Sequence, residues 1–430
     1  MKKKVYVALS ADILHEGHIN ILKKASKLGK VTVGLLTDKA IAEYKKLPVL
    51  NFNQRKQVIK SLKFVNYIIP QDTMDYRPNL LKLRPDYVVH GDDWKKGVLK
   101  KSREQVLKTI KKWSGKLIEP KYTKTISSSL IKQRLKILPD IRDNRVAILN
   151  RLLQAKKFIR IIESHSALVG NIIENLRING KMNTVEEFDG FWSSSLAESL
   201  IRGKPDNESV SLETRITALS DLADTTFKPI IFDADNGGRL EHIPYLISSL
   251  ERQGVSAVVM EDKIGLKRNS LFADQSKTKQ DSIQNFSKKI KIASEAKRYK
   301  DFLIVARIES LIIGTGVNDA LKRAISYSRN GADLILIHSK DKTPHKIFKF
   351  AKMFKKSKYF KPLIAVPSSY SKTHEKDLKK NNIQVVIYAN QLLRSSHLSI
   401  TKTALSILKN KRSFEAEKNI SSVNEIINLK

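Results

Sequence analysis

The sequence predicts an α/β protein with two domains, an open parallel sheet followed by a closed barrel of strands and helices. The chain has 430 residues, which is enough for two hydrophobic cores. Strand-like apolar runs alternate with helical patterns along its whole length. Roughly eight such strand–helix pairs fill the last 250 or so residues, as in a (β/α)8 barrel. We expect the first domain at residues 1–136, a linker and first helix at 137–157, and the barrel at 158–430.

Composition excludes several classes of protein. The chain has no cysteine, which rules out disulfides, thiolate metal sites and a Cys nucleophile. Its apolar content of 41% describes a folded protein. No apolar run is long enough to span a membrane, and the N-terminal residues meet an acid too early for a signal peptide. We therefore expect a cytoplasmic protein.

The charge is strongly positive, with 80 Lys and Arg against 43 Asp and Glu, a net charge of +37. Such a charge invites a nucleic-acid partner and also suits anionic substrates. The lysines, however, occur in nearly every predicted helix and accompany many Ile and Asn residues, as in a compositionally biased genome. We therefore favour a diffuse, solvated charge over a nucleic-acid-binding surface.

In the first domain, strands are predicted at residues 5–9, 31–36, 65–69 and 87–90, with helices near 19–28 and 53–62. This alternation indicates a doubly wound, Rossmann-like sheet. The motif His15-x-Gly17-His18 joins the first strand to its helix. Two imidazoles at a helix N-terminus can hold a triphosphate and neutralise leaving pyrophosphate, and Gly17 allows close approach. The alternative is that the His pair only shapes the turn.

Three further features accompany this motif. They are Gly91-Asp92-Asp93-Trp94 after the fourth strand, Arg55 on the middle helix, and the hydroxyl cluster Ser127-Ser128-Ser129. Together they resemble the cytidylyltransferases of the glycerol-3-phosphate and phosphoethanolamine type. The resemblance implies CTP as a co-substrate, with Asp38 and Asp93 also near the site. The nucleotide-binding residues that it implies are Ser10, His15, Gly17, His18, Lys46 (or Lys45), Asp92, Trp94, Ser127, Ser128 and Ser129.

This sequence departs from the family pattern at three places. Leu9-Ser10-Ala11-Asp12 stands where Gly-Thr-Phe-Asp is usual, Lys63-Phe64-Val65-Asn66 replaces Arg-Tyr-Val-Asp, and Tyr122-Thr123-Lys124-Thr125 replaces Arg-Thr-x-Gly. An active transferase and a catalytically silent domain therefore both remain open, and the acceptor is not specified.

In the second domain, strands are predicted at residues 158–162, 188–192, 229–232, 255–260, 302–306, 332–337, 362–366 and 384–388. Barrel chemistry is carried at the C-terminal ends of the strands. Nearly every predicted strand ends in polar residues: Ser164-His165, Ser193-Ser194-Ser195, Asp233 and Asp235, Glu261-Asp262-Lys263, Arg307 and Glu309, His338-Ser339, Pro367-Ser368, and Asn390.

Acidic residues follow two consecutive strands. Asp233 and Asp235 are two residues apart and point the same way on an extended chain. Glu261 and Asp262 end the next strand. Three or four converging carboxylates suit a hard cation, Mg²⁺ before a softer metal. For a single acid, helix capping is the alternative; for the whole group we predict a site.

These residues resemble phosphoenolpyruvate mutase of the isocitrate lyase superfamily across about residues 156–430. The matching motifs are Asp233-x-Asp235, Glu261-Asp262-Lys263-x5-Asn269-Ser270, Val305-Ala306-Arg307-x-Glu309, His338-Ser339-Lys340, the stretch 191–196 and the loop 203–206. The superfamily's lyases carry a catalytic Cys that this chain lacks. The Asn269-Ser270 pair favours the mutase over phosphonopyruvate hydrolase, which the sequence also resembles.

The resemblance implies a set of roles. Asp233 would bind Mg²⁺ directly, and Asp235, Glu261 and Glu309 would do so through water. Trp192, Ser194, the backbone N–H of Ser195, Ser270, Arg307 and His338 would bind substrate, with no need for the Ser195 hydroxyl. Arg307, Asn269, His338, Lys267 and Asp206 would serve catalysis, Asp206 on a lid at residues 203–210.

The two resemblances together suggest a phosphonate-biosynthesis enzyme that interconverts phosphoenolpyruvate and 3-phosphonopyruvate and transfers a cytidylyl group with CTP. A bifunctional enzyme of fosfomycin biosynthesis is similar in domain order. The open alternatives are a phosphonopyruvate hydrolase, a mutase with a silent first domain and, less favoured, a nucleic-acid-binding protein. The resemblance also implies a dimer or tetramer built by exchange of a C-terminal helix.

Overall fold

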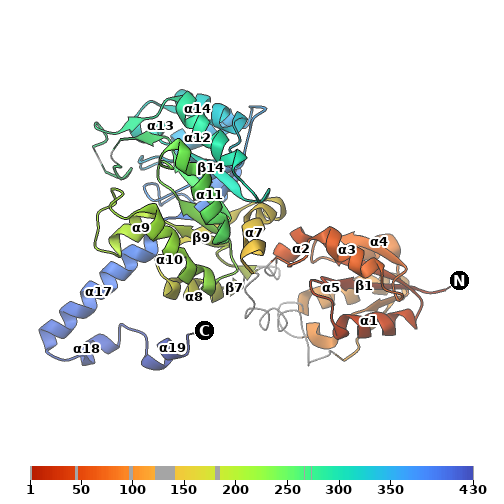
Figure 1. Cartoon of the computed structure of the whole chain (residues 1–430). Coiled ribbons are helices and arrows are strands. Elements are labelled where there is room, and N and C mark those ends of the chain that lie inside the picture. Colours follow the sequence, from red (N-terminus) through yellow and green to blue (C-terminus); the bar gives the residue numbers. More distant parts are fainter. Residues whose placement is uncertain are drawn as a thin grey trace. The chain divides into compact units, whose positions relative to one another are not determined.

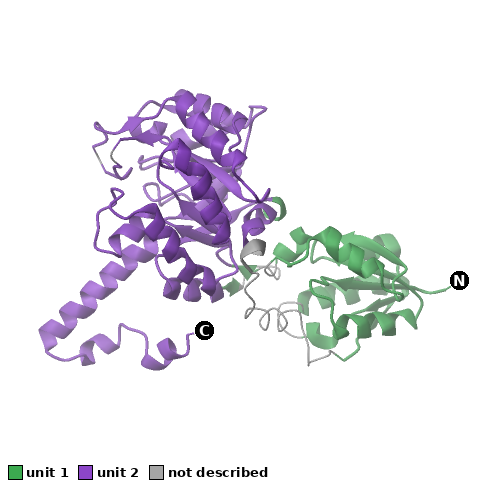
Figure 2. Ribbon diagram, in the orientation of Figure 1, with its two compact units in different colours: residues 1–139, 154–156, 177–186 green, residues 140–153, 157–176, 187–430 purple. Residues whose placement is uncertain are grey.

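The computed structural model describes residues 2–43, 47–95, 100–121, 141–179, 185–265, 267–272 and 274–429. The chain divides into two compact units (Figures 1 and 2). One comprises residues 1–139, 154–156 and 177–186, and the other comprises residues 140–153, 157–176 and 187–430. In the described residues, no helix has both the length and the apolar character needed to cross a bilayer.

The first unit contains a parallel sheet whose described strands lie in the order β3-β2-β1-β4-β5. The predicted doubly wound fold is therefore confirmed. The strands are β1 (Lys4–Leu9), β2 (Lys30–Leu36), β3 (Tyr67–Gln71), β4 (Tyr87–Val89) and β5 (Lys116–Ile118). Only the short β5 was not predicted. Strand order reverses between β1 and β4, and at such a switch point the strand ends diverge to leave a crevice for ligands.

Helices cover both faces of this sheet (Figure 1). Successive side chains of a strand point to opposite faces. Accordingly, Val5 and Val7 of β1 belong to one core, while Tyr6 and Ala8 belong to the other. The helical segments are α1 (Glu16–Ser26), α2 (Asp38–Ala42), α3 (Phe52–Lys60), α4 (Arg77–Leu83), η1 (Asp92–Lys95), α5 (Lys100–Ile110) and η3 (Lys111–Trp113).

In the second unit, the described strands form a closed parallel barrel in the order β10-β11-β14-β15-β16-β17-β6-β9. The predicted TIM (β/α)8 fold is confirmed, and each predicted run overlaps one strand. The strands are β6 (Ile159–Glu163), β9 (Gly190–Ser193), β10 (Ile230–Asp233), β11 (Ala257–Glu261), β14 (Leu303–Ile308), β15 (Leu334–Ile337), β16 (Leu363–Ala365) and β17 (Ile383–Tyr388). Two short antiparallel strand pairs were not predicted: β12 (Lys263–Ile264) with β13 (Lys279–Gln280) in this unit, and β7 (Ile178–Asn179) with β8 (Val185–Glu186), whose residues are assigned to the first unit.

The barrel helices pack against the strands through one extensive hydrophobic core. They are α7 (Ile141–Ala155), α8 (Ala167–Asn175), α9 (Ser195–Leu200), α10 (Leu212–Thr225), η5 (Leu240–His242), α11 (Ile243–Arg252), α12 (Ile283–Glu295), α13 (Ser310–Ile313), α14 (Val317–Arg329), α15 (His345–Phe354) and α16 (Glu375–Lys380). They are followed by α17 (Gln391–Asn410), α18 (Phe414–Glu417) and α19 (Val423–Ile427). Helix α17 projects from the barrel (Figure 1), and none of its residues is buried.

The buried Arg145 connects α7 to the barrel through hydrogen bonds. Arg145 is 1% exposed, and its guanidinium donates hydrogen bonds of 2.6–3.0 Å to the carbonyls of Ala223, Thr226, Gln253 and Gly254. These carbonyls lie at the C-terminal ends of α10 and α11, where helices leave carbonyl groups unpaired and favour a cation. Arg145 thus stabilises the end of the barrel opposite the strands' C-termini.

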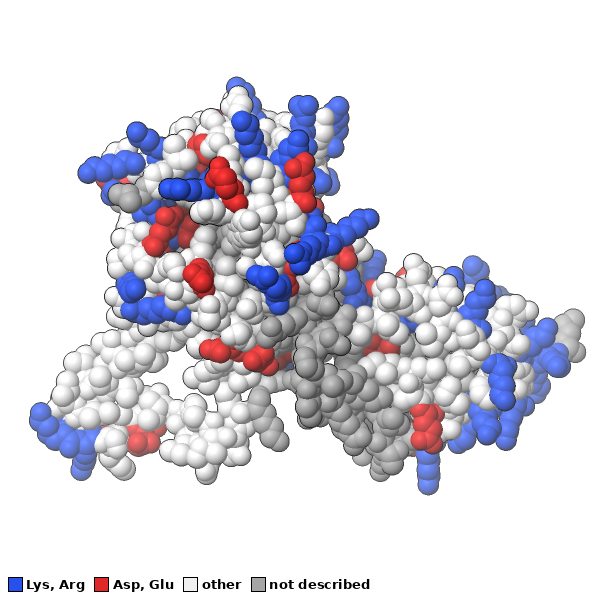
Figure 3. Space-filling model, viewed as in Figure 1, with Lys and Arg blue, Asp and Glu red and all other residues white. Residues whose placement is uncertain are grey.

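Charged side chains are dispersed over the face of the molecule drawn in Figure 3. Lys and Arg residues are spread over both units there, with Asp and Glu among them. This face agrees with the diffuse distribution expected from the sequence.

Candidate active site

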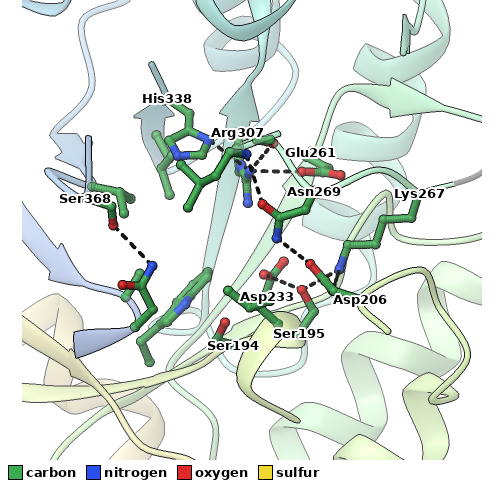
Figure 4. A pocket seen from close by; sticks show the side chains of 18 of the residues that line it. Ser194, Ser195, Asp206, Asp233, Glu261, Lys267, Asn269, Arg307, His338 and Ser368 are labelled. Carbon is green, nitrogen blue, oxygen red and sulfur yellow. Dashed lines mark hydrogen bonds and ion pairs between the residues drawn. The ribbon is translucent and has the colours of Figure 1, made fainter. Parts of the chain in front are cut away.

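A pocket opens at the C-terminal ends of the barrel strands (Figure 4). Most of its polar lining comes from segments that follow β9, β10, β11, β14 and β15. It is lined by Trp192, Ser194, Ser195, Leu196, Asp206, Asp233, Glu261, Lys263, Lys267, Asn269, Ser270, Leu271, Arg307, Leu336, His338, Val366, Ser368, Ala389 and Asn390. The predicted substrate-binding and catalytic residues of the barrel are all among them.

Arg307 lies at the centre of a network of ion pairs and hydrogen bonds in the pocket. Its Nε donates to Glu309 at 2.7 Å, and its guanidinium contacts Ser270 Oγ at 2.9 Å and His338 Nδ1 at 3.0 Å. Glu309 also accepts from Ser270 at 2.6 Å. Burial would raise the pKa of Glu309, but Arg307 and Lys263 outweigh burial and hold that pKa well below its ordinary value. Burial and Arg307 lower the pKa of His338, which keeps its imidazole neutral.

The negative charge of Glu261 is offset by nearby cations less fully than that of Glu309. Glu261 ion-pairs with Lys263 at 3.2 Å and with Arg307 at 3.3 Å. Burial raises the pKa of Glu261 to about 7, because the two cations do not offset desolvation and the nearby negative charges of Glu309 and Asp233.

Asp233 is held by a serine and a lysine. Ser195 Oγ donates to Asp233 at 2.9 Å and lies 2.5 Å from Lys267 Nζ. Burial opposes ionisation of Asp233, but Lys267, Arg307 and Arg215 lower its pKa overall. The Ser195 hydroxyl therefore connects an acid and a cation of the pocket, whereas the sequence interpretation assigned a role only to its N–H group.

The predicted lid contacts the loop that follows β11. Asp206 accepts from Lys267 Nζ at 2.6 Å and from Asn269 Nδ2 at 2.7 Å (Figure 4). Glu208, on the same segment, has a φ of 67°, a backbone conformation that is strained for a residue with a side chain. Of residues 203–210, Asp206 lines the pocket.

Two acids lie differently from the prediction. Strand β10 ends at Asp233, and Asp235 has a φ of 53°, so the alternation of an extended chain does not apply to it. Asp235 is instead paired with Arg215 at 2.9 Å and with Lys267. Asp262 does not line the pocket; it lies among residues of α14, and burial raises its pKa to about 6. It is therefore not part of a converging set of metal ligands.

The carboxylates of this pocket fit a magnesium ion that keeps much of its water. Within the ranges that the structure describes, no three Asp, Glu or His side chains are grouped closely enough to hold a metal together. Asp233 and Glu261 nevertheless both line the pocket, at the ends of adjacent strands. Mg²⁺ is commonly bound by one or two carboxylates with water completing its shell. The oxygen donors and the incompletely compensated charge of Glu261 suit such a hard cation.

In the first unit, both motif histidines bind the start of helix α1. His15 Nδ1 accepts the Gly17 N–H at 3.2 Å, and His18 Nδ1 accepts the His15 N–H at 3.4 Å. Because Nδ1 accepts in each ring, the proton of each neutral imidazole is on Nε2. Burial lowers the pKa of His15, which favours this neutral form. The ring centroids of the two histidines lie 4.0 Å apart at the helix N-terminus.

The other predicted nucleotide-site residues fall into three groups. Ser10 and Asp92 follow β1 and β4, the two strands at the switch point. Trp94 is fully buried, stacks on His90 at 3.9 Å and donates to Glu119; its contact with a nucleotide stays a prediction. Lys46 (with Lys45), Ser127, Ser128 and Ser129 lie outside the described residues.

Arg55, a feature of the sequence pattern, is also structural. It is 0% exposed, and its guanidinium donates to the carbonyls of Ser10, Leu36 and Leu50 and to Asp38. This arrangement fixes the ends of β1 and β2.

Sequence reasoning missed Arg215. Its guanidinium is buried, pairs with Asp235 and lies 4.7 Å from the centre of the Phe232 ring. Arg215 is in the first turn of α10, remote in sequence from any strand end, and no local pattern marks it.

Comparison with known proteins assigns each unit. A family model described as phosphoenolpyruvate phosphomutase matches residues 149–408, and one described as cytidylyltransferase-like matches residues 10–134. The chain is 33% identical over 282 residues to a phosphoenolpyruvate phosphomutase of Tetrahymena pyriformis, covering 65% of this chain and 89% of the relative.

Two further matches extend this comparison. A crystal structure of phosphonopyruvate hydrolase with oxalate and Mg²⁺ aligns with a TM-score of 0.59 and 31% identity, covering 66% of this chain and 94% of that one. A FAD synthase of Korarchaeum cryptofilum is 33% identical over 147 residues, covering 32% of this chain and 95% of the relative.

Proposed function

Because the chain belongs to the phosphoenolpyruvate phosphomutase family, we propose that its barrel interconverts phosphoenolpyruvate and 3-phosphonopyruvate. The observation that carries this proposal is the gathering of Asp233, Glu261, Arg307 and His338 in one pocket with Lys267, Asn269 and Ser270. Such a lining offers acids for a cation and donors for a substrate with carboxylate and phosphoryl groups.

In the proposed reaction, the bond between phosphorus and the enol oxygen of phosphoenolpyruvate breaks and a bond between phosphorus and C3 forms. The enol becomes a ketone, and no atom is gained or lost. The transferring phosphoryl group carries charge on its oxygens and needs electrostatic restraint more than proton transfer.

Arg307 is positioned for this restraint. Glu309 and Ser270 hold its guanidinium, whose planar donors suit carboxylate and phosphoryl oxygens. The neutral His338 and Asn269 would donate hydrogen bonds to the phosphoryl group. Ser270 would join them by exchanging its bond to Glu309. Ser194 and the Ser195 N–H, near the start of α9, would bind the carboxylate beside Trp192.

We propose Asp233 as a direct ligand of Mg²⁺, with Asp235, Glu261 and Glu309 acting through water. When bound, Mg²⁺ would supply positive charge beside the substrate oxygens. Lys267 would add a second positive charge, because Asp235, Asp233 and Asp206 raise its pKa against the opposing effect of burial.

The main alternative is hydrolysis of phosphonopyruvate, the activity named for the relative with oxalate and Mg²⁺. The two reactions differ in whether water reaches the phosphoryl group. Asp206, bonded to Lys267 and Asn269, would close the lid and exclude water, which favours the mutase.

Phosphorus NMR of the protein with Mg²⁺ and phosphonopyruvate separates these activities. We expect conversion to phosphoenolpyruvate, the direction that the mutase equilibrium favours. Inorganic phosphate would instead indicate the hydrolase, and an unchanged spectrum would contradict both.

For the first unit we propose a nucleotidyltransferase that uses CTP and a phosphonate or phosphate ester as acceptor. The proposal rests on the cytidylyltransferase-like match over residues 10–134 and on the His15-x-Gly17-His18 turn at the N-terminus of α1, beside the β1–β4 switch point. The FAD synthase relative makes an adenine nucleotide the competing choice. Pyrophosphate release from CTP or ATP, measured with aminoethylphosphonate, phosphoethanolamine or FMN as acceptor, decides between them. No release with any pair would leave a silent domain.

We also propose that the chain assembles as a dimer or tetramer through α17. Leu398, Ile400, Leu405 and Leu408 of this helix are more than half exposed. Solvent-exposed apolar side chains in such number favour a partner. Sedimentation of the protein beside a Leu405→Glu/Leu408→Glu variant tests this, since a monomeric wild-type protein would contradict it.

A further inference from the structure

One buried acid next to the pocket has no role in the mechanism above. Asp262 follows Glu261 in sequence but is 0% exposed and does not line the pocket. Its carboxylate accepts four hydrogen bonds: Oδ1 from the Glu309 N–H at 3.0 Å, and Oδ2 from Tyr327 at 2.8 Å, Gln280 at 3.0 Å and Arg323 at 3.1 Å. The carboxylate thus bonds to the backbone of Glu309 and to the side chains of three other residues.

These bonds join the pocket to helix α14. The Asp262 N–H donates to the Arg307 carbonyl at 3.1 Å, while its Oδ1 accepts from the Glu309 N–H. Asp262 thus hydrogen-bonds to the residues before and after Ile308. Strand β14 ends at Ile308, and helix α13 begins at Ser310. On the other side of Asp262, Arg323 and Tyr327 belong to the long helix α14.

The segment held in this way carries the central side chains of the pocket. Glu309 bonds the guanidinium of Arg307 at 2.7 Å and lies 3.1 Å from His338 Nδ1. A rotation of the Glu309 backbone would therefore move the partner that orients Arg307. Mutation of residues that hydrogen-bond to metal ligands or catalytic side chains commonly lowers metal affinity or activity by about 10- to 100-fold.

We propose that Asp262, supported by Arg323 and Tyr327, is a positioning residue that fixes the end of β14, with Arg307, and the Glu309 that follows it. The inference rests on the proposed mutase activity for its kinetic consequence. The effect of Asp262 on the geometry of the site can be tested separately from catalysis, through binding of an anion.

Asp262→Asn tests the proposal with little change in shape. Asn offers one oxygen, so it can accept from Glu309 N–H or from the Arg323 and Tyr327 side, but not from both. We expect kcat for phosphoenolpyruvate formation to fall by roughly 10- to 100-fold in the folded protein. Binding of oxalate with Mg²⁺, followed by calorimetry, should weaken severalfold in the same variant.

Arg145→Met is the matched control. Arg145 is also buried and also donates several hydrogen bonds to backbone, but its partners lie at the opposite end of the barrel. We expect this variant to lower the unfolding temperature while kcat, KM and oxalate affinity per folded molecule stay unchanged. Should Asp262→Asn fail to fold, Tyr327→Phe, which removes one of the four bonds, replaces it, with an expected two- to fivefold loss of kcat.

The proposal would be overturned if folded Asp262→Asn kept the wild-type kcat and oxalate affinity. It would also be overturned if Arg145→Met changed these two quantities as much as Asp262→Asn does. The proposed function fails separately, if the wild-type protein forms no phosphoenolpyruvate. In that case the oxalate titration still decides whether Asp262 positions the site.

Discussion

The two units use the ends of their parallel strands in different ways. In the barrel, the strand ends form a ring, and charge pairs with charge at the end of one strand or between segments that follow neighbouring strands: Arg307 with Glu309, Lys267 with Asp206 and Asp235. In the first unit, the strand ends lie along a line. Polar side chains there bond to nearby backbone, as His15 does to Gly17 and Arg55 does to Ser10.

This difference has a consequence for ligand binding. A ligand of the barrel has to exchange with existing ion pairs, so removal of one member leaves a buried, unpaired charge. A ligand of the first unit would meet His15, whose bond to the Gly17 backbone sets its direction and which can be replaced by another helix-capping residue, whereas the buried Arg55 is needed by the fold.

The largest expected effect is on the barrel. Asp233→Ala removes the acid that Ser195 and Lys267 surround, and we expect phosphoenolpyruvate formation to fall by about a thousandfold. Nucleotide turnover by the first unit should not change. Phosphorus NMR and pyrophosphate release on one preparation check both statements, and retained mutase activity would contradict the assigned role.

A smaller loss is expected in the first unit. His15→Asn keeps a residue that caps helices well but removes the Nε2 donor. We expect pyrophosphate release to fall by about a hundredfold with the unfolding temperature nearly unchanged. A normal rate in this variant would mean that the imidazole only shapes the turn.

The Ser195 hydroxyl gives a finer test of the paired network. Ser195→Ala removes the group that joins Asp233 to Lys267, and we expect the Mg²⁺ concentration for half-maximal activity to rise about tenfold. Ser195→Thr, which keeps a hydroxyl, should restore most of the affinity. A Mg²⁺ titration in which both variants match the wild type would limit the residue to its N–H group.

The smallest effect concerns acid stability of the first unit. Arg103 and Trp94 bond to Glu119, and the Arg103 hydrogen bond lowers its pKa to about 2 from an ordinary 4.5. A lowered pKa stabilises the fold above pH 4.5 and loses that contribution as the pH falls from 4.5 toward 2. Glu119→Gln should therefore lower the unfolding temperature by about 5 °C at pH 6 and by less at pH 3. Equal shifts at both pH values would contradict the ion-pair explanation.

Much of the fold follows from local sequence. Buried parallel strands are short apolar runs, and residues such as Asp233, Glu261, Arg307 and His338 follow them directly. Because a barrel brings the C-terminal ends of its strands together, knowing which residues follow each strand was enough to predict most of the pocket lining. The His15-x-Gly17-His18 turn was predictable for the same reason, since its spacing is local.

The partners of those residues were decided only by the tertiary structure. Glu261 and Asp262 are adjacent acids, yet one lines the pocket and the other points to α14, because consecutive residues at a strand end face opposite sides. The left-handed backbone at Asp235 and the arrival of Arg215 from α10 depend on contacts between distant segments. Sequence spacing determines which side chains reach the mouth of the barrel; packing of the surrounding helices determines which charges they meet there.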